Sequence, residues 1–269
     1  MTGLAAGVAK LADAQGLGPC SARSVGSSPS ARTADRSWGC MKIDIQFSPG
    51  ANDWPVLRAA ILQAEADGYD TTWVFDHFDG GMIQGDRPML ECFTLLGAIA
   101  AATTTIGLGT LVANVANRHP AVLASAASSV QRISGGRLTL GLGAGTAPNS
   151  KWSSEHVARS IPLSADIADR HAAVLDQIRL IRELPEPTPI IVGVNSVRLA
   201  VLAGEFADGI NVRMTNERAG EFVKAGRHAA GDRPFEISGW TFDSVDDVRE
   251  QALELTLDRL VLTRLGPIS

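Results

Sequence analysis

The stretch TTTIGLGTLVANVANRHPAVLASAASSVQRISGGRLTLGLGAG, residues 103–145, holds two short apolar runs on either side of a helical segment. The runs Thr105–Gly109 and Leu138–Leu142 have the length and the apolar character of buried strands. The helical segment begins at Pro120, a residue that suits the first turn of a helix, and two glycines end it. This stretch therefore predicts a strand–helix–strand unit with parallel strands.

The same unit repeats along the chain from Met41 onward. Between Asn52 and Asp67, apolar residues at i, i+1, i+4, i+5 and i+8 share one helix face, and Gly68 ends that helix. Further helices are predicted at 88–102, 120–133, 166–184, 196–206, 216–228 and 245–255. The eight predicted strands are Lys42–Gln46, Thr71–Phe75, Thr105–Gly109, Leu138–Leu142, Ile190–Val192, Gly209–Val212, Phe235–Thr241 and Arg259–Thr263.

Regular alternation of strands and helices favours a parallel sheet. Eight strands in a chain of 269 residues predict an α/β fold, a small closed (β/α)8 TIM barrel formed by residues 41–269. An open doubly wound sheet is the alternative. After Thr263 only RLGPIS remains, so the eighth helix of the barrel is missing. Either a partner subunit in a homodimer covers that flank, or the chain is truncated.

Residues 1–40 differ from the rest of the chain. They are rich in Ser, Arg and Gly, show no helix or strand period, and carry a net charge of +2 against −7 for residues 41–269. The apolar run Leu4–Ala9 is too short for a secretory signal, and two aspartates argue against a transit peptide. The segment instead resembles a translated transfer-RNA gene, because VGSSP at 25–29 can be encoded by GTGGGTTCGAGTCCC, which contains the common T-arm motif. We favour a wrongly assigned start over a true flexible tail, and in both cases we predict disorder in this leader.

Composition excludes several functional classes. The net charge of −5 argues against a nucleic-acid surface, and no apolar run is long enough for a membrane-spanning helix. Three cysteines, Cys20, Cys40 and Cys92, are too scattered for a disulfide framework or a zinc site, and His156, His171 and His228 show no metal spacing. We expect a cytoplasmic protein that acts on a small molecule, without metal, nucleic acid or membrane partners.

Polar and titratable residues follow the predicted strands at their carboxyl ends, where barrels of this kind carry their sites. Asp76 and His77 follow the second strand. A neutral imidazole exchanges protons near pH 7 and an adjacent acid can hold its tautomer, so we predict that His77 and Asp76 are catalytic. The alternative is a rim histidine bonded to backbone. Asn211, Arg213, Trp240 and Arg264 lie near the ends of later strands.

Two glycine-containing segments on this rim suit a polar ligand. Gly141–Gly145 follows a strand, but Thr146 replaces the third glycine of a dinucleotide fingerprint and no helix begins there, so a nicotinamide enzyme is disfavoured. Gly193–Ser196 precedes a helix, where Asn195 or Ser196 can cap it and free amides favour an anion. An ordinary tight turn and an ordinary helix cap are the alternatives.

Three stretches give the chain a resemblance to the bacterial luciferase-like monooxygenase superfamily: GYDTTWVFDHF at 68–78, the stretch 103–145, and PTPIIVGVNSVRLAVLAGEFADGINV at 187–212. The resemblance extends over nearly all of 41–264. It implies a (β/α)8 barrel that binds a flavin-type coenzyme. One branch of the superfamily uses reduced FMN and oxygen, and the other uses coenzyme F420 for hydride transfer. The Asp-His-Phe motif at 76–78 is typical of the F420 branch, whereas FMN monooxygenases often have Glu-His-His-Phe.

The resemblance also implies roles for single residues. Asp76 and His77 would face the ring and the substrate, and Leu111–Val112 would form a bulge with a cis peptide behind the ring. Some F420 dehydrogenases have a glutamate that acts as an acid where this chain has Thr146, so His77 would have to act as the acid here. The usual insertion between Leu163 and Pro189 is reduced, which implies an open pocket. The predicted coenzyme-binding residues are Thr110, Leu111, Val112, Asn114, Gly145, Thr146, Gly193, Val194, Asn195 and Ser196.

Three functions therefore stay open: F420-dependent hydride transfer to or from a small organic substrate, FMN-dependent monooxygenation, and a non-catalytic flavin-binding barrel. The missing helix and the absent lid motivate the third. The motif at 76–78 favours the first.

Overall fold

In the computed structural model, which describes residues 41–80 and 89–268, eight parallel strands close into a barrel in chain order. The prediction of a (β/α)8 barrel is confirmed, and the open doubly wound alternative is wrong. The predicted disorder of the leader concerns residues outside the described part of the chain. The strands are β1 (Lys42–Phe47), β2 (Thr71–Val74), β3 (Gly107–Asn114), β4 (Leu138–Gly143), β5 (Ile190–Gly193), β6 (Gly209–Arg213), β7 (Glu236–Thr241) and β8 (Arg259–Arg264).

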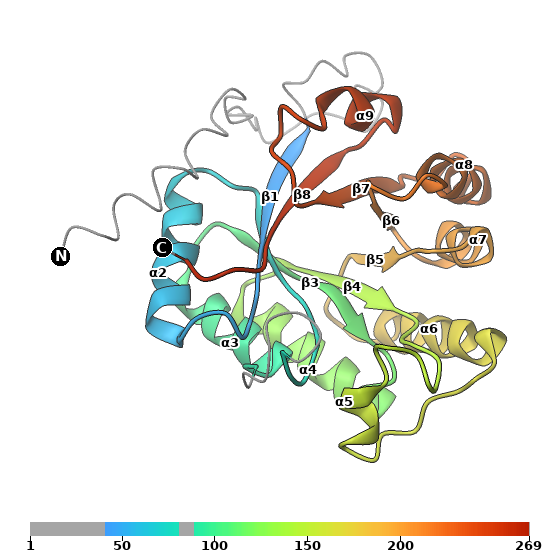
Figure 1. Ribbon diagram of the computed structural model, residues 1–269, viewed down its shortest axis with the longest axis horizontal. Coiled ribbons are helices and arrows are strands. Elements are labelled where there is room, and N and C mark those ends of the chain that lie inside the picture. Colours follow the sequence, from blue (N-terminus) through green and yellow to red (C-terminus); the bar gives the residue numbers. More distant parts are fainter. Residues whose placement is uncertain (1–40, 81–88, 269) are drawn as a thin grey trace.

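Helices surround the strands in chain order (Figure 1). The short helix α5 belongs to the segment between β4 and α6, and no helix follows β8 in the residues described up to 268. The predicted homodimer that would cover this side stays a prediction. The helices are α2 (Trp54–Ala66), α3 (Cys92–Ala102), α4 (Pro120–Ile133), α5 (Ser154–Val157), α6 (Ile167–Arg182), α7 (Val197–Phe206), α8 (Ala219–Ala230) and α9 (Arg249–Glu254).

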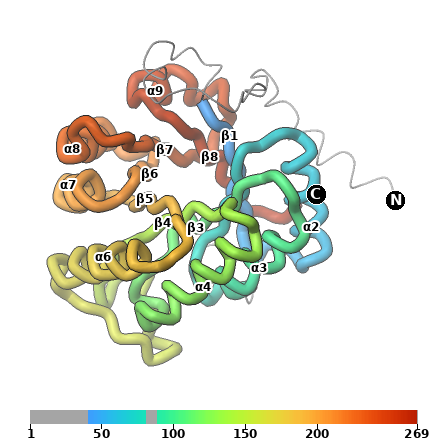
Figure 2. The backbone as a smooth tube through the Cα atoms, turned by 180° about the vertical axis from the view of Figure 1, so that it is seen from behind, coloured from blue at the N-terminus to red at the C-terminus, as the bar shows by residue number. Residues whose placement is uncertain are grey.

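The segment after β8 crosses to the start of α2, and the C-terminus lies beside α2 in both views (Figure 2). The backbone N–H of Ile268 donates to Asn52 Oδ1 at 3.0 Å, and Ile268 packs on the edge of the core. This segment therefore packs on the flank of the barrel near α2.

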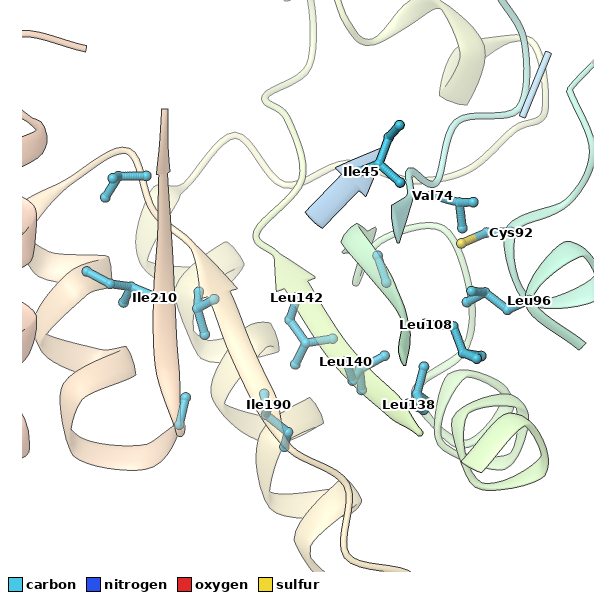
Figure 3. Close-up of a cluster of buried hydrophobic side chains, with 14 of the residues drawn as sticks. Ile45, Val74, Cys92, Leu96, Leu108, Leu138, Leu140, Leu142, Ile190 and Ile210 are labelled. Carbon is cyan, nitrogen blue, oxygen red and sulfur yellow. The ribbon is translucent and has the colours of Figure 1, made fainter. Parts of the chain in front are cut away.

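The main core lies between the outer face of the strands and the helices. Figure 3 shows Cys92 and Leu96 of α3 turned toward the strands that carry Val74 and Leu108. Cys92 is fully buried, and burial raises the pKa of its thiol well above the usual value. A thiol in this environment packs as a small apolar side chain and is unreactive.

The amino-terminal end of the barrel interior is filled by charged and aromatic side chains. Asp44 is fully buried, accepts a hydrogen bond from Trp73 Nε1 at 2.7 Å and pairs with Arg259. Arg259 also pairs with Glu236 at 2.8 Å, and Lys42 pairs with the same carboxylate. Because these residues lie on β1, β2, β7 and β8, this cluster, the barrel floor, joins the first strands to the last.

The pKa values of the two carboxylates of the barrel floor are shifted in opposite directions. Burial raises the pKa of Asp44 to about 6, although Arg259 opposes it. Burial also acts on Glu236, but the charges of Arg259 and Lys42 outweigh it and lower the pKa of Glu236 to about 2. The difference follows from the number of cations, one for Asp44 and two for Glu236.

Strand β3 is longer than the predicted run Thr105–Gly109. It begins at Gly107 and continues to Asn114, with a register shift against β4 between Thr110 and Ala113. The irregularity breaks the alternation that sequence patterns detect. It also places polar residues of β3 at the carboxyl end of the barrel.

Candidate active site

A cavity of about 780 Å³ opens at the carboxyl ends of the strands. Its volume is in the range of small-molecule and cofactor sites. All eight strands, or the residues directly after them, contribute to its wall. The wall residues that carry polar, charged or aromatic side chains include Gln46, Phe75, Asp76, His77, Asn114, Thr146, Trp152, Glu155, His156, Asn195, Asn211, Arg213, Asn216, Trp240, Phe242 and Thr263.

Ten of the twelve predicted site residues line this cavity. The two exceptions use their hydroxyls elsewhere. Thr110 Oγ1 donates to the Gly141 carbonyl at 2.7 Å inside the sheet, and Ser196 Oγ caps α7 by accepting from the Leu199 N–H at 3.2 Å. The ten in the wall are Asp76, His77, Leu111, Val112, Asn114, Gly145, Thr146, Gly193, Val194 and Asn195.

His77 pairs with a carboxylate that sequence reasoning missed. Its Nδ1 lies 2.7 Å from Glu155 Oε1, and the other oxygen of Glu155 accepts from the Phe78 backbone N–H at 2.7 Å. Burial raises the pKa of Glu155, but the hydrogen bonds and charge of His77 and the Phe78 N–H outweigh it and lower the pKa below its usual value. An ionised Glu155 therefore accepts a hydrogen bond from Nδ1–H of His77, which leaves Nε2 as the ring nitrogen available to exchange a proton.

Asp76 does not hold His77, contrary to the expectation from their adjacency. Its carboxylate accepts from both terminal nitrogens of Arg118, at 2.6 and 2.7 Å, and from the Asn114 backbone N–H at 3.0 Å. Successive side chains of an extended chain point to opposite sides, so neighbours at a strand end rarely share one target. Asp76 joins the end of β2 to the end of β3.

His156 lies in the cavity wall, although the sequence shows it only as one of several scattered histidines. It is fully buried, and its Nε2 lies 2.8 Å from Asn117 Oδ1 and 3.0 Å from Asn114 Nδ2. These contacts fix the short helix α5 against the loop after β3. Because Glu155 is the preceding residue, His156 also helps to place the carboxylate beside His77.

Val112 lies between two glycines of neighbouring strands. A Cβ on Gly143 would come within 2.4 Å of Val112 Cγ2, and one on Gly193 within 2.8 Å of Val112 Cγ1. Larger residues at either position would displace Val112. The Leu111–Val112 peptide is cis, as the resemblance implied.

An arginine and two aromatic rings form another part of the wall. The Arg213 guanidinium lies over the Trp240 ring, 5.1 Å from its centroid, and the Trp240 and Phe242 rings meet edge to face at 5.3 Å. Arg213 and Trp240 are register partners on β6 and β7. Among the described residues Arg213 has no carboxylate partner. The two carboxylates of the wall, Asp76 and Glu155, instead pair with Arg118 and His77.

No group of three or more His, Cys, Asp or Glu residues arranged for a metal ion occurs in the described part of the chain. None of the described helices is both long enough and apolar enough to cross a membrane.

Several known proteins are similar to this chain. A family model described as luciferase-like monooxygenase matches residues 40–264. A 5,10-methylenetetrahydromethanopterin reductase of Archaeoglobus fulgidus is 27% identical over 79% of this chain and 67% of its own length. An F420-dependent hydroxymycolic acid dehydrogenase of Mycobacterium tuberculosis is 28% identical over 86% of this chain and 68% of its own length. The matches thus span about two thirds of these relatives.

Solved structures agree on the fold. The coenzyme F420 dependent tetrahydromethanopterin reductase from Methanopyrus kandleri superposes with a TM-score of 0.67 at 15% identity, over 83% of this chain and 93% of that chain. At this identity the likeness concerns the barrel alone.

Proposed function

Because the chain belongs to the luciferase-like monooxygenase family, we propose that it is an oxidoreductase that binds coenzyme F420 and moves a hydride to or from a small organic substrate. The observation that carries the proposal is the His77–Glu155 pair in the wall of the cavity. The Asp-His-Phe motif at 76–78 and the F420-dependent relative support the choice of coenzyme.

The residues of the cavity fit a flavin-type coenzyme. Leu111 and Val112 offer an apolar surface for a ring, and the absence of side chains on Gly143 and Gly193 leaves room for Val112 to lie there. Gly145, Thr146 and Asn195 lie in the same wall and offer backbone and side-chain donors for a polar tail. Thr110 and Ser196 drop out of the proposed set because their hydroxyls serve the sheet and the helix cap.

The protein's own contribution to the chemistry is proton transfer. When bound, F420 supplies a deazaflavin ring that accepts or gives up a hydride. His77 Nε2 has no hydrogen-bond partner among the described residues, and His77 lines the cavity. In the oxidative direction His77 Nε2 takes the hydroxyl or amine proton of the substrate as the hydride leaves its carbon. In the reductive direction it returns that proton.

Glu155 and Asp76 act through other residues in this proposal. Glu155 keeps the Nδ1 proton of His77 in place and stabilises the protonated ring, which an acid–base histidine needs. Asp76, held by Arg118, positions the strand end that carries His77. His77, supported by Glu155 of α5, thus takes the acid role for which Thr146 offers no carboxyl group, and Asp76 is proposed as a positioning residue rather than a catalytic one.

FMN-dependent monooxygenation is the second candidate, because the family description itself names monooxygenases. A fluorescence titration of the full chain with F420 and, separately, with FMN distinguishes the two. We expect tight binding of F420 alone, followed by turnover in a screen of alcohols, imines and enoates. Binding of FMN alone would move the function to oxygen chemistry. A folded protein that binds neither would favour a non-catalytic barrel.

We place this reaction in a reducing cytoplasm. The support for this proposal is that Cys92, the free cysteine of the described residues, is a buried thiol and forms no disulfide.

A further inference from the structure

The charges in the cavity wall are unevenly balanced. The wall contains two carboxylates and one guanidinium. Asp76 is paired with Arg118, and Glu155 is paired with His77. Arg213 is the one fully charged group of this wall that has no partner of opposite charge among the described residues. A molecule in the cavity therefore meets a cation whose charge the surrounding protein leaves uncompensated.

Arg213 is held in a way that leaves its donors usable. It is the last residue of β6, and the Trp240 ring lies 5.1 Å below its guanidinium carbon. Contact with the face of a ring uses none of the guanidinium N–H groups, and the planar fork can still bind two oxygens of a carboxylate or a phosphate. Phe242 contacts the Trp240 ring edge to face and so helps to hold it in place.

An amide donor lies in the same part of the wall. Asn216 lines the cavity, and its backbone N–H donates to the Arg213 carbonyl at 3.0 Å, which ties the two residues together. Its Oδ1 accepts from the Arg218 N–H at 2.9 Å, so the Nδ2 group of Asn216 points away from that bond as a donor. No hydrogen bond of this Nδ2 group occurs within the described residues. A guanidinium and an amide donor form a pair that suits an anion.

The position of Arg213 separates it from the acid–base pair. In the closed barrel β6 is four strands away from β2, after which His77 lies. The proposed coenzyme residues come from β3, β4 and β5, between the two. A substrate that reaches from His77 across the cavity would therefore place its far end near Arg213.

We propose that Arg213, supported by Trp240 and Asn216, binds an anionic group of the substrate, a carboxylate or a phosphate, and so selects acidic substrates. This inference rests on the proposed function of the same cavity. The polar tail of the coenzyme is a second source of such an anion. Residues at the ends of β4 and β5 already offer donors for that tail, so we assign Arg213 to the substrate.

A calorimetric titration of the full chain with phenyl phosphate tests the inference, with neutral benzamide as the matched probe. Both probes are titrated without coenzyme and again after saturation with F420. We expect phenyl phosphate to bind the wild type in both states and at least about tenfold more weakly to Arg213→Gln, since a charge-assisted fork is lost. The control Arg218→Gln, an exposed residue paired with Glu221 outside the cavity wall, should bind like the wild type.

Other outcomes overturn the inference. Phenyl phosphate that binds no better than benzamide, or equally well to Arg213→Gln, removes the anion site. If Arg213→Gln instead weakens F420 at least about tenfold and phenyl phosphate competes with F420, the anion belongs to the coenzyme and the substrate assignment fails. A protein that binds no F420 contradicts the proposed function, while the titration without coenzyme still decides whether Arg213 holds an anion.

Discussion

Glu155 and His77 are the residues on which turnover should depend most directly. His77→Ala removes the proton donor and acceptor, and we expect turnover to fall by about 10²–10⁴. Glu155→Gln keeps the shape of the side chain but loses the charge that stabilises a protonated His77, so a smaller fall, about 10–10², is expected. The measurement is kcat together with the dissociation constant of F420, which should change little in either variant.

A matched control separates this role from a loss of folding. Glu217→Gln changes an exposed glutamate on the connection between β6 and α8 and should leave kcat unchanged. If Glu155→Gln retained full turnover, the pairing with His77 would have no part in proton transfer. If it lost F420 binding instead, Glu155 would serve the shape of the pocket.

The sequence allowed prediction of His77 but not of its partner. His77 follows a strand with a clear apolar pattern, and residues after such strands meet at one rim. Glu155 lies 78 residues further along the chain on a helix of four residues, which is too short to leave a periodic signal. The adjacent Asp76 was a misleading candidate because neighbouring side chains on an extended strand diverge. A polar pair such as Glu155 and His156 in the connection after β4 is the signal that could have found the site.

At the scale of elements, α7 and α8 pack through a glycine. A Cβ on Gly204 would come within 2.3 Å of the Gly226 carbonyl oxygen and 2.7 Å of Ala229 Cβ. Gly204→Ala must therefore separate the two helices, and we expect it to lower the free energy of unfolding by about 1–3 kcal/mol. Urea denaturation measures this change.

Gly97 provides the opposite case on another helix. It lies inside α3, and a Cβ there would meet nothing within 4 Å. Gly97→Ala should raise the free energy of unfolding by about 0.5–1 kcal/mol, because alanine favours a helix over glycine. Equal effects of the two substitutions would mean that the α7–α8 contact is not tight.

Long periodic elements were predictable, and irregular ones were not. Apolar spacing placed α4 at Pro120–Ile133 as found, since proline and glycine mark both of its ends. The second half of β3 was missed because its register shift interrupts the strand period, and α5 because it has barely one turn. These two irregular elements carry Asn114 and Glu155, so the site was harder to predict than the barrel.

For the whole molecule, closure of the barrel depends on the charges of its floor. Arg259→Met leaves the Asp44 carboxylate buried without its cation, and we expect a loss of about 3–5 kcal/mol in the free energy of unfolding near neutral pH. The double variant Asp44→Asn, Arg259→Met should recover part of this loss, since the fully buried carboxylate is then gone. Chemical denaturation of the single and double variants gives both values.

The same variant should be sensitive to pH in a defined direction. Burial holds the pKa of Asp44 at about 6, above its usual 3.8, so this group favours the folded state below 3.8 and that benefit is lost as pH rises through about 6. Without Arg259 only the hydrogen bond from Trp73 opposes the effect of burial on this pKa. Arg259→Met should therefore be more destabilised at about pH 8 than at about pH 5. A loss that is the same at both pH values would mean that removing Arg259 does not raise the pKa of Asp44 any further.

The order of the site residues along the chain has a consequence for how such an enzyme can diversify. The residues proposed for proton transfer lie between 77 and 156, whereas Arg213, Asn216 and Trp240, proposed for substrate binding, lie on the second half of the barrel. Recombination that exchanged residues 209–264 would alter which molecules enter while leaving the catalytic half intact. Such a chimera must keep the α7–α8 contact at Gly204, and at the opposite end of the barrel the incoming segment must bring an arginine at position 259 to meet Asp44. A change of substrate selectivity could then be acquired by the exchange of one continuous gene segment.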